Sequence, residues 1–318
     1  MLSSAPSKLK TSLTSGLASL GVVYIIWSTT YLAIRIAVAP GNGFPPFAMG
    51  TARLFAAFIL LILIAKFSGK RLRLTRREVL VAAITGLLLW VGGNGLVNWA
   101  EQSANSGFAA LMVASDPIWV VALNAVLLRR LPSPLLITSL VFGFTGVAVL
   151  MAPSIIAGDS TNLIATLALL IAALSWAIGS VYQTRRQIST SVLVLSAYQH
   201  LFGALGTLVM SILLHESFPH PTGSAWLAWG YLVLFGSVLA YTCFIRALKL
   251  LPINLVMTYS YVNPVLALLL GWWVLNEKIT IFTGIGAIMV LLGVVGTFSV
   301  RHPKPSPAKV KLNSQPSI

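Results

Sequence analysis

The chain has 318 residues, of which 57% are hydrophobic and only 8% are charged, with a formal net charge of +15. A soluble domain carries about 25% charged residues, and a soluble core of this apolarity would have too little polar surface to cover it. The composition therefore excludes an ordinary soluble protein and indicates the bilayer as solvent. The single cysteine, Cys243, excludes an intramolecular disulfide framework and a multi-cysteine zinc site.

Ten segments approach the roughly 20 apolar residues that a membrane-spanning helix needs. They cover residues 16–38, 45–67, 79–100, 107–128, 134–152, 162–183, 191–213, 225–245, 253–275 and 279–299. The connections between them are short and rich in proline and glycine, so none has room for a soluble catalytic domain. The sequence predicts an all-α membrane protein with ten transmembrane helices, a cytoplasmic N-terminal segment over 1–15 and a disordered basic tail over 300–318.

The basic residues gather on alternate connections. With the N-terminus inside, the cytoplasmic segments hold Lys8, Lys10, Lys66, Lys70, Arg71, Arg73, Arg76, Arg77, Arg129, Arg130, Arg185, Arg186, Arg246, Lys249, Arg301, Lys304, Lys309 and Lys311. The outer loops hold only Lys278. By the positive-inside rule, both termini are predicted to be cytoplasmic. The run 66–77 also suits contact with anionic lipid headgroups, and this distribution argues against nucleic acid as a partner.

The two halves of the chain align when the sequence is shifted by 147 residues. The shift places Pro117 on Pro264 and Gly146 on Gly293. Each half contains five predicted crossings, and because five is odd the second half must enter the membrane from the opposite side. The sequence therefore predicts two repeats of inverted topology, over 16–152 and 162–299, an architecture on which many secondary transporters are built.

Four stretches carry a resemblance to a known family. They are Trp27–Arg35, Pro45–Ala48 leading to Arg53, Ser175–Ser180, and the long run Pro264–Lys278 with its short Glu-containing hairpin. Together they resemble the EamA domains of the drug/metabolite transporter (DMT) superfamily over about residues 16–299. The resemblance implies ten helices and the export of amino acids or other metabolites. The sequence departs from the family at the first-half hairpin, where Arg129-Arg130 stands in place of a frequent Gly-Glu and where positive-inside pressure explains the arginines.

Four polar side chains are expected near the membrane midplane. Arg53 and Asp116 lie roughly 12 Å below the outer end of their helices at 1.5 Å per residue, and their repeat mates are His200 and Asn263. A charge inside the membrane costs about 2.5–3.5 kcal/mol on insertion scales, so it needs a reason. Arg53 could bind a substrate carboxylate with Asp116 as its counter-charge, or the two could form a permanent ion pair that fixes two helices. If transport is coupled to protons, Asp116 and His200 are the candidates.

Further candidates flank this quartet. Trp27, Tyr31 and Trp176 could stack on a substrate or pack the bundle. Asn94 and Asn98 are four residues apart and share a helix face, so they could line a vestibule or join helices by hydrogen bonds. Tyr241, Tyr259 and Tyr261 are weaker candidates of the same kind, and Arg35 near a helix end is expected to reach the headgroups.

Two prolines interrupt the fourth and ninth predicted helices at equivalent places. Proline removes a backbone hydrogen bond and kinks a helix, so Pro117 and Pro264 are candidate gating points as well as candidate static kinks. Glycines at 143, 146, 286, 293 and 296 place small residues along the fifth and tenth helices. Close helix packing explains them, and a dimer contact there is left open, so the chain is expected to be a monomer or a homodimer.

The sequence has no glycine-rich phosphate loop, no evident Ser/His/Asp triad and no metal-ligand cluster. We therefore expect neither cofactor nor metal, and no enzymatic activity. The prediction is a secondary transporter of the bacterial inner membrane that exports amino acids or related small metabolites. A lipid-processing intramembrane enzyme and a channel are the alternatives. The first would need clustered acids or histidines, and the second would favour a continuous polar stripe.

Overall fold

The computed structural model describes residues 5–41, 43–129, 133–156, 160–186 and 188–299, and every regular element in these ranges is helical. This confirms the predicted all-α class. Arg130, Asp159 and the basic tail from residue 300 lie outside the described residues. The elements are α1 (Ala5–Ala37), α2 (Pro46–Phe67), α3 (Arg76–Gly86), η1 (Leu87–Gly95), α4 (Leu96–Ala100), α5 (Ser106–Val113), α6 (Asp116–Leu127), α7 (Pro134–Ile156), α8 (Ser160–Arg185), α9 (Val192–Leu213), α10 (Gly223–Tyr231), η2 (Leu232–Tyr241), α11 (Thr242–Leu250), α12 (Ile253–Val256), α13 (Tyr259–Leu275) and α14 (Ile281–Ser299).

Seven helical stretches in the described ranges are long and apolar enough to cross a membrane. They cover Leu13–Ala37, Pro46–Phe67, Arg76–Ala100, Ser106–Leu127, Asn162–Arg185, Val192–Leu213 and Gly223–Leu250. Three shorter apolar helices, Ile137–Leu150, Val262–Leu275 and Ile281–Gly293, occupy the other expected segments. The chain is thus a multi-pass membrane protein. Helix α1 begins at Ala5, well before the expected start at residue 16, because no proline or glycine interrupts the polar stretch between Pro6 and Gly16.

Local sequence sets where several helices begin and end. Proline occupies the first turn of α2, where its missing N–H leaves no bond unmade. Thr75 and Glu78 form a capping box at the start of α3, each side chain bonding the other's backbone N–H. Helix α13 ends at Leu275, and the next residue, Asn276, has a left-handed φ of 53°, a conformation that asparagine tolerates well.

Four of the predicted spans are not continuous α-helices. The third and eighth contain π-helical stretches, η1 and η2, and the 147-residue shift places these two stretches over one another. The fourth is divided into α5 and α6, and the ninth into α12 and α13. π-Helical turns are frequent at functional sites, and the substrate sites of many transporters are formed by interrupted helices. Both halves therefore carry irregular backbone in corresponding spans.

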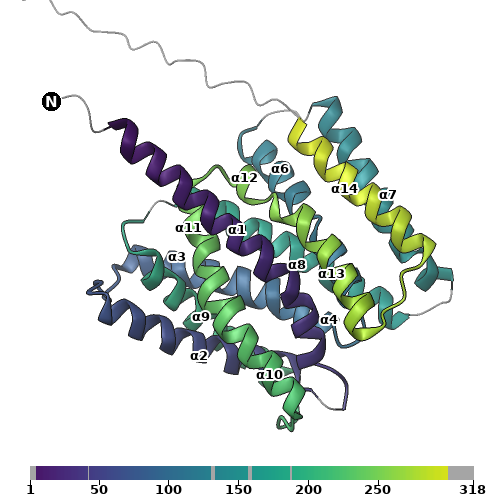
Figure 1. Cartoon of the computed structure of the whole chain (residues 1–318), viewed down its shortest axis with the longest axis horizontal. Helices are drawn as coiled ribbons and strands as arrows, with labels where there is room; N and C mark the ends of the chain where they lie inside the picture. The colour runs from purple at the N-terminus through teal and green to yellow at the C-terminus, as the bar shows by residue number, and fades with distance from the viewer. Residues whose placement is uncertain (1–4, 42, 130–132, 157–159, 187, 300–318) are drawn as a thin grey trace, which may run out of the picture.

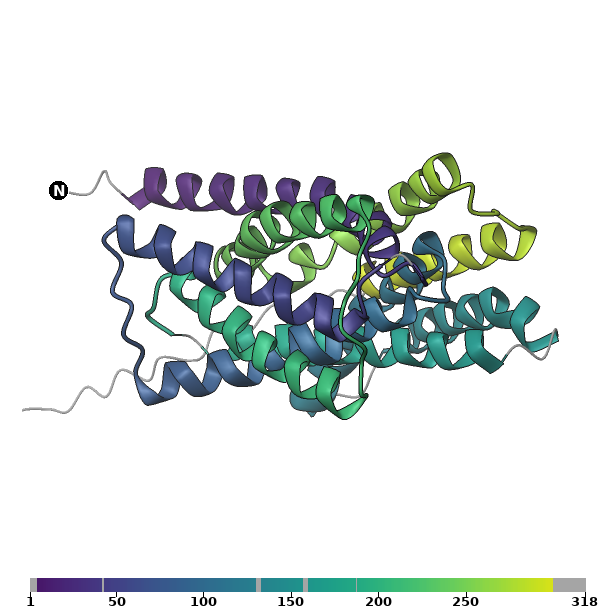
Figure 2. The same ribbon diagram turned by 90° about the horizontal axis from the view of Figure 1, so that it is seen from below.

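The packing joins one half of the chain to the other. Helix α2 packs on α9, α7 on α14, α1 on α13 and η1 on α8. Helices α7 and α14 lie side by side at one flank of the bundle and contact each other far more than they contact the rest (Figures 1 and 2). Their glycines allow this approach, since a Cβ on Gly293 would lie 2.6 Å from the Cα of Gly143. The interrupted helices therefore lie in the bundle centre.

Two ends of the bundle are distinguished by charge. The "basic face" carries the start of α1, the 66–77 loop and the end of α8 with Arg185. The "opposite face" carries the connections over 38–45, 101–105, 214–222 and 276–280. Figure 2 shows the N-terminal end of α1 and the loop after α2 at the same end of the molecule.

Candidate substrate cavity

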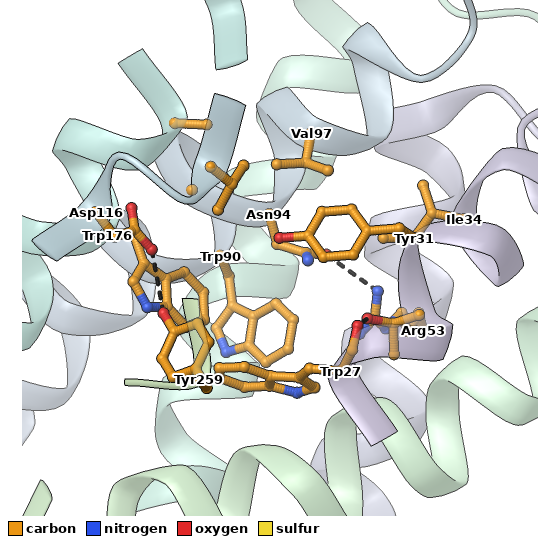
Figure 3. Close-up of a pocket in the computed structure, with 14 residues that line it drawn as sticks. Trp27, Tyr31, Ile34, Arg53, Trp90, Asn94, Val97, Asp116, Trp176 and Tyr259 are labelled. Carbon is orange, nitrogen blue, oxygen red and sulfur yellow. Dashed lines mark hydrogen bonds between the residues drawn. The ribbon is translucent and has the colours of Figure 1, made fainter. Parts of the chain in front are cut away.

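A cavity lies in the bundle centre, where α1, α2, η1, α8 and the interrupted fourth and ninth spans meet. Its lining is mostly aromatic and apolar, with a few polar groups (Figure 3). The lining residues are Trp27, Thr30, Tyr31, Ile34, Arg53, Trp90, Gly93, Asn94, Val97, Val113, Asp116, Ala172, Trp176 and Tyr259. This combination is typical of small-molecule sites.

Arg53 is held in one wall of the cavity by α2 and is only 2% exposed. Its Nε donates to Ser237 Oγ at 2.8 Å, and one terminal nitrogen donates to Asn94 Oδ1 at 3.0 Å. The guanidinium also lies 5.3 Å from the centre of the Trp90 ring. These partners come from the two π-helical stretches, η1 and η2. They fix the guanidinium and leave other N–H donors of its planar fork without a described protein partner.

Asp116 lies on the other side of the cavity and is fully buried. It is the first residue of α6, so it occupies the first turn of a helix, where the macrodipole favours a negative charge. Its Oδ2 accepts a 3.1 Å hydrogen bond from the Tyr259 hydroxyl, and its Oδ1 has no partner in the described structure. One carboxylate oxygen is therefore left for another ligand.

The expected Arg53–Asp116 ion pair does not form in the described structure. The described hydrogen bonds of Arg53 go to Ser237 and Asn94, and that of Asp116 comes from Tyr259. Figure 3 shows Arg53 and Asp116 on opposite sides of the cavity, with aromatic rings between them. The rise per residue places both side chains at the same depth in the membrane, but it does not show toward which neighbouring helix each side chain points.

The repeat mates of this pair lie outside the cavity lining. His200 is fully buried, with Nδ1 2.7 Å from the Ser196 carbonyl oxygen and its ring packed on Trp90 and Tyr241. Asn263 accepts a 3.0 Å hydrogen bond from Ser28 Oγ. The structure thus brings only two members of the predicted quartet to the cavity lining. Arg53 and Asp116 line the cavity, whereas His200 and Asn263 support the walls behind it.

The aromatic candidates do come together. Trp27 contacts Trp176 with ring centres 5.4 Å apart and Tyr259 with centres 5.2 Å apart, both edge to face. Tyr31 lies one turn along α1 from Trp27 and also lines the cavity. Sequence reasoning missed Trp90, which lies under Arg53 and against His200. The adjoining Gly92-Gly93 pair marks a close helix approach there, because a Cβ at Gly93 would lie 2.8 Å from the Trp176 ring.

The two asparagines separate in the structure. Asn94 lines the cavity and accepts from Arg53. Asn98 is 1% exposed and turns toward α2, where its Nδ2 would be 3.6 Å from a Cβ at Gly50. Asn98 therefore packs against α2 and is not among the residues that line the cavity.

The prolines differ in their structural effect. Pro117 is in the first turn of α6, where a backbone N–H has no intrahelical partner. The helical interruption of this span precedes it, at Ala114–Ser115. Pro264 lies inside α13, while the ninth span is divided earlier, at Met257–Thr258. The expectation that both prolines interrupt their helices in the same way is therefore wrong, because one begins a helix and the other lies within one. Their role in gating stays a prediction.

Two carboxylates hold helix starts at the opposite face. Glu216 accepts from the backbone N–H groups of Phe47 and Ala48, at 3.0 and 2.7 Å, at the start of α2. Glu277 accepts from the N–H and hydroxyl of Ser106, at 2.9 and 3.0 Å, at the start of α5. Each glutamate comes from the second half of the chain and caps a helix of the first half.

Comparison with known proteins places this architecture in a family. The sequence profile described as "EamA-like transporter family" matches residues 14–152 and again residues 163–299. The chain is 33% identical over 282 residues to the "Uncharacterized inner membrane transporter YedA" of Escherichia coli (strain K12), with 87% of this chain and 88% of that protein covered. It is 27% identical over 289 residues to the "Uncharacterized transporter YoaV" of Bacillus subtilis (strain 168), covering 89% and 96%.

A solved structure also shares the fold. That structure is described only as "Crystal structure of protein". It superposes with a TM-score of 0.64 at 22% sequence identity, and the match covers 89% of this chain and 96% of the other. At this identity the likeness concerns the fold alone. The two family matches cover most of the chain, one in each half, and named relatives span nearly its whole length. The chain therefore belongs to the EamA-like transporter family.

Proposed function

We propose that this transporter is a secondary carrier that exports amino acids or related small metabolites through the central cavity. The observation that carries the proposal is the placement of Arg53 and Asp116 on opposite walls of an aromatic-lined cavity, each with part of its hydrogen-bonding capacity unused. A guanidinium and a carboxyl group separated by a cavity suit a ligand that carries both an acidic and a basic group. An amino acid in its zwitterionic form is the simplest such ligand.

The roles of the two residues follow from their chemistry. The free edge of the Arg53 guanidinium would bind the substrate carboxylate, and Asp116 Oδ1 would accept from the substrate ammonium. Trp27, Tyr31, Trp90 and Trp176 would contact the side chain, with the indole faces also attracting a cation. His200 and Asn263 would act only by supporting Trp90 and α1.

The route across the membrane would use the two repeats. Ten crossings in two inverted five-helix repeats allow one set of helices to rock against the other and open the cavity to one face at a time. Two features support this movement: the interrupted spans provide places where helices can bend, and they occupy equivalent positions in the two halves. We place the chain in a bacterial inner membrane with both termini and the basic face in the cytoplasm. Coupling to protons is part of the proposal.

Counterflow in proteoliposomes tests the proposal. Vesicles containing the purified protein would be loaded with a mixture of unlabelled amino acids, and entry of a dilute radiolabelled mixture would be followed. A carrier gives transient accumulation of label, and Arg53→Gln and Asp116→Asn should each abolish it. Thr145→Val is the matched control, since Thr145 is exposed on α7 and bonds only the Val141 carbonyl of its own helix.

Three outcomes would contradict the proposal. Equilibration of label without transient accumulation indicates a channel. Counterflow that persists in both variants would show that Arg53 and Asp116 do not bind the transported substrate. Lack of counterflow by the folded wild-type protein, together with a chemically altered lipid in the vesicles, would favour the intramembrane enzyme.

A further inference from the structure

Glu101 is a buried acid that neither the family match nor the central cavity explains. It follows α4 at the opposite face and is 0% exposed. Both of its carboxylate oxygens are without a hydrogen-bond partner in the described structure. An ionised carboxylate in such a place loses its hydration and gains no hydrogen bond in return, so the neutral form is favoured.

Two charged side chains near Glu101 act on its carboxyl in opposite directions. Arg35 of α1 approaches, but the described hydrogen bonds of its guanidinium go to the main-chain carbonyl groups of Glu101 and Gln102, the latter at 2.7 Å. The other charged group that acts on Glu101 is Glu277, a like charge on the hairpin between α13 and α14, and the Tyr31 hydroxyl lies within electrostatic reach. Burial first, and then Glu277, raise the pKa of the Glu101 carboxyl well above its ordinary value, while Arg35 lowers it.

Two segments of the opposite face lie next to Glu101, and we expect both to move when the cavity opens to this face. One is the end of α1, tied down by Arg35. The other is the start of α5, which Glu277 caps. Ile34, beside Arg35 on α1, lines the cavity itself. Separation of these segments would admit water to Glu101, and a hydrated glutamate carboxyl is ionised at neutral pH.

We propose, resting on the transport function proposed above, that Glu101 is the proton-binding residue that couples closure of the opposite face to uptake of one proton. With the face closed, the carboxyl is neutral and buried. With the face open, the carboxylate is hydrated and the proton has left to the solvent on that side. Each closing movement therefore takes up one proton from the opposite side, and each opening movement returns it.

The sign of the pH dependence follows from linkage. The closed state binds one proton more than the open state between the ordinary pKa of a glutamate and the raised one. Rising pH in this window therefore favours the open state, by at most tenfold in the equilibrium constant per pH unit for one proton. Below the window both states are protonated and pH has no effect through this residue.

Cysteine accessibility tests the proposal without any transported substrate. In a Cys243→Ser background, Ile34→Cys reports opening, and Ser217→Cys, on an exposed loop of the same face, reports the pH dependence of thiol reactivity itself. The probe is an impermeant maleimide applied to the protein in vesicles. The labelling rate at position 34 relative to position 217 should rise several-fold per pH unit above neutrality. In Glu101→Gln it should be low and change less than twofold over the same range.

Two further variants separate titration from structure. Glu101→Asp keeps a titratable group, so the pH response should return with a shifted midpoint. Glu216→Gln changes an acid of the same face that caps α2, and it should keep the wild-type response. Infrared difference spectra of the purified protein provide a direct readout, because the protonated carboxyl band of Glu101 should be present at neutral pH and absent from Glu101→Gln.

A pH response that persists unchanged in Glu101→Gln would overturn the proposal, as would an infrared titration in which Glu101 is ionised at neutral pH. Neither measurement uses an amino acid. Failure here would therefore leave the carrier function standing, and failure of counterflow would leave the Glu101 result standing.

Discussion

Tyr259 donates a 3.1 Å hydrogen bond to Asp116, and each of the two is the first residue of a helix that restarts inside the bundle. Asp116 begins α6 in the first half of the chain, and Tyr259 begins α13 in the second. The bond therefore joins the two interrupted spans at the point where both backbones are irregular. It also occupies one oxygen of Asp116 and leaves the other without a hydrogen-bond partner in the described structure.

The first prediction concerns this bond. In a double-mutant cycle on unfolding free energy, Tyr259→Phe and Asp116→Asn should couple by about 0.6–1.7 kcal/mol, between the average and the maximum measured for hydrogen bonds between membrane helices. Arg53→Gln and Asp116→Asn should instead be additive within about 0.5 kcal/mol, because the two side chains share no bond. Unfolding in mixed detergent micelles measures both cycles. Strong coupling between Arg53 and Asp116 would contradict this prediction and would indicate that the two side chains form an ion pair.

The second prediction concerns topology. Arg73→Cys in the loop of the basic face and Ser306→Cys in the tail should resist an impermeant thiol reagent in intact cells, both in a Cys243→Ser background. Ser217→Cys on the opposite face should react and is the matched control. Reaction at either of the first two sites would contradict a cytoplasmic basic face.

The third prediction separates the two prolines. Pro264→Ala would supply an N–H for the Ser260 carbonyl and straighten α13, whereas Pro117→Ala adds an N–H in a first turn that does not use one. Both variants should fold. Pro264→Ala should slow turnover in counterflow severalfold, and Pro117→Ala should slow it less. Equal, wild-type rates in both would leave Pro264 as a static feature of α13.

The fourth prediction uses the two carboxylate caps as controls for each other. Glu277→Ala removes the acceptor for the Ser106 amide, and Glu216→Ala removes the acceptors for the amides of Phe47 and Ala48. Hydrogen bonds to a charged acceptor contribute about 1.5–3 kcal/mol. Hydrogen exchange followed by mass spectrometry should therefore speed up by about tenfold or more at the start of α5 in the first variant, and at the start of α2 in the second. Exchange that changes equally at both sites in either variant would indicate general loosening.

Sequence reasoning found the helices because apolar runs of this length have no other stable solution than a membrane span. It placed Trp27, Tyr31, Arg53, Asn94, Asp116 and Trp176, which the structure brings to one cavity. It did not resolve direction around a helix. His200 and Asn98 have suitable depth, yet each turns toward another helix and away from the cavity.

The π-helical stretches account for part of that failure. An extra residue in a helical turn rotates everything beyond it, so a spacing of four residues no longer guarantees one face. Asn94 lies within η1 and Asn98 beyond it, and only the first lines the cavity. Trp90 also lies in η1, and its role depends on Arg53 from α2 and His200 from α9, neither of which is near it in sequence.

The last prediction concerns the flank formed by α7 and α14. A Cβ on Gly293 would lie 2.6 Å from the Gly143 Cα and 2.7 Å from its nitrogen, and backbone atoms cannot move aside as a flexible side chain can. Gly284 lies on the same helix, and a Cβ there would meet nothing within 4 Å. Overpacking of this kind typically costs about 1–3 kcal/mol, whereas alanine in place of an unhindered helical glycine is neutral or favourable. Gly293→Ala should therefore lower the midpoint of thermal unfolding in detergent, and Gly284→Ala should leave it unchanged or raise it. Since α7 and α14 contact the cavity helices only sparingly, the Gly293→Ala protein that remains folded should keep its counterflow rate. A folded Gly293→Ala protein that has lost transport would show instead that this helix pair takes part in the movement of the two repeats.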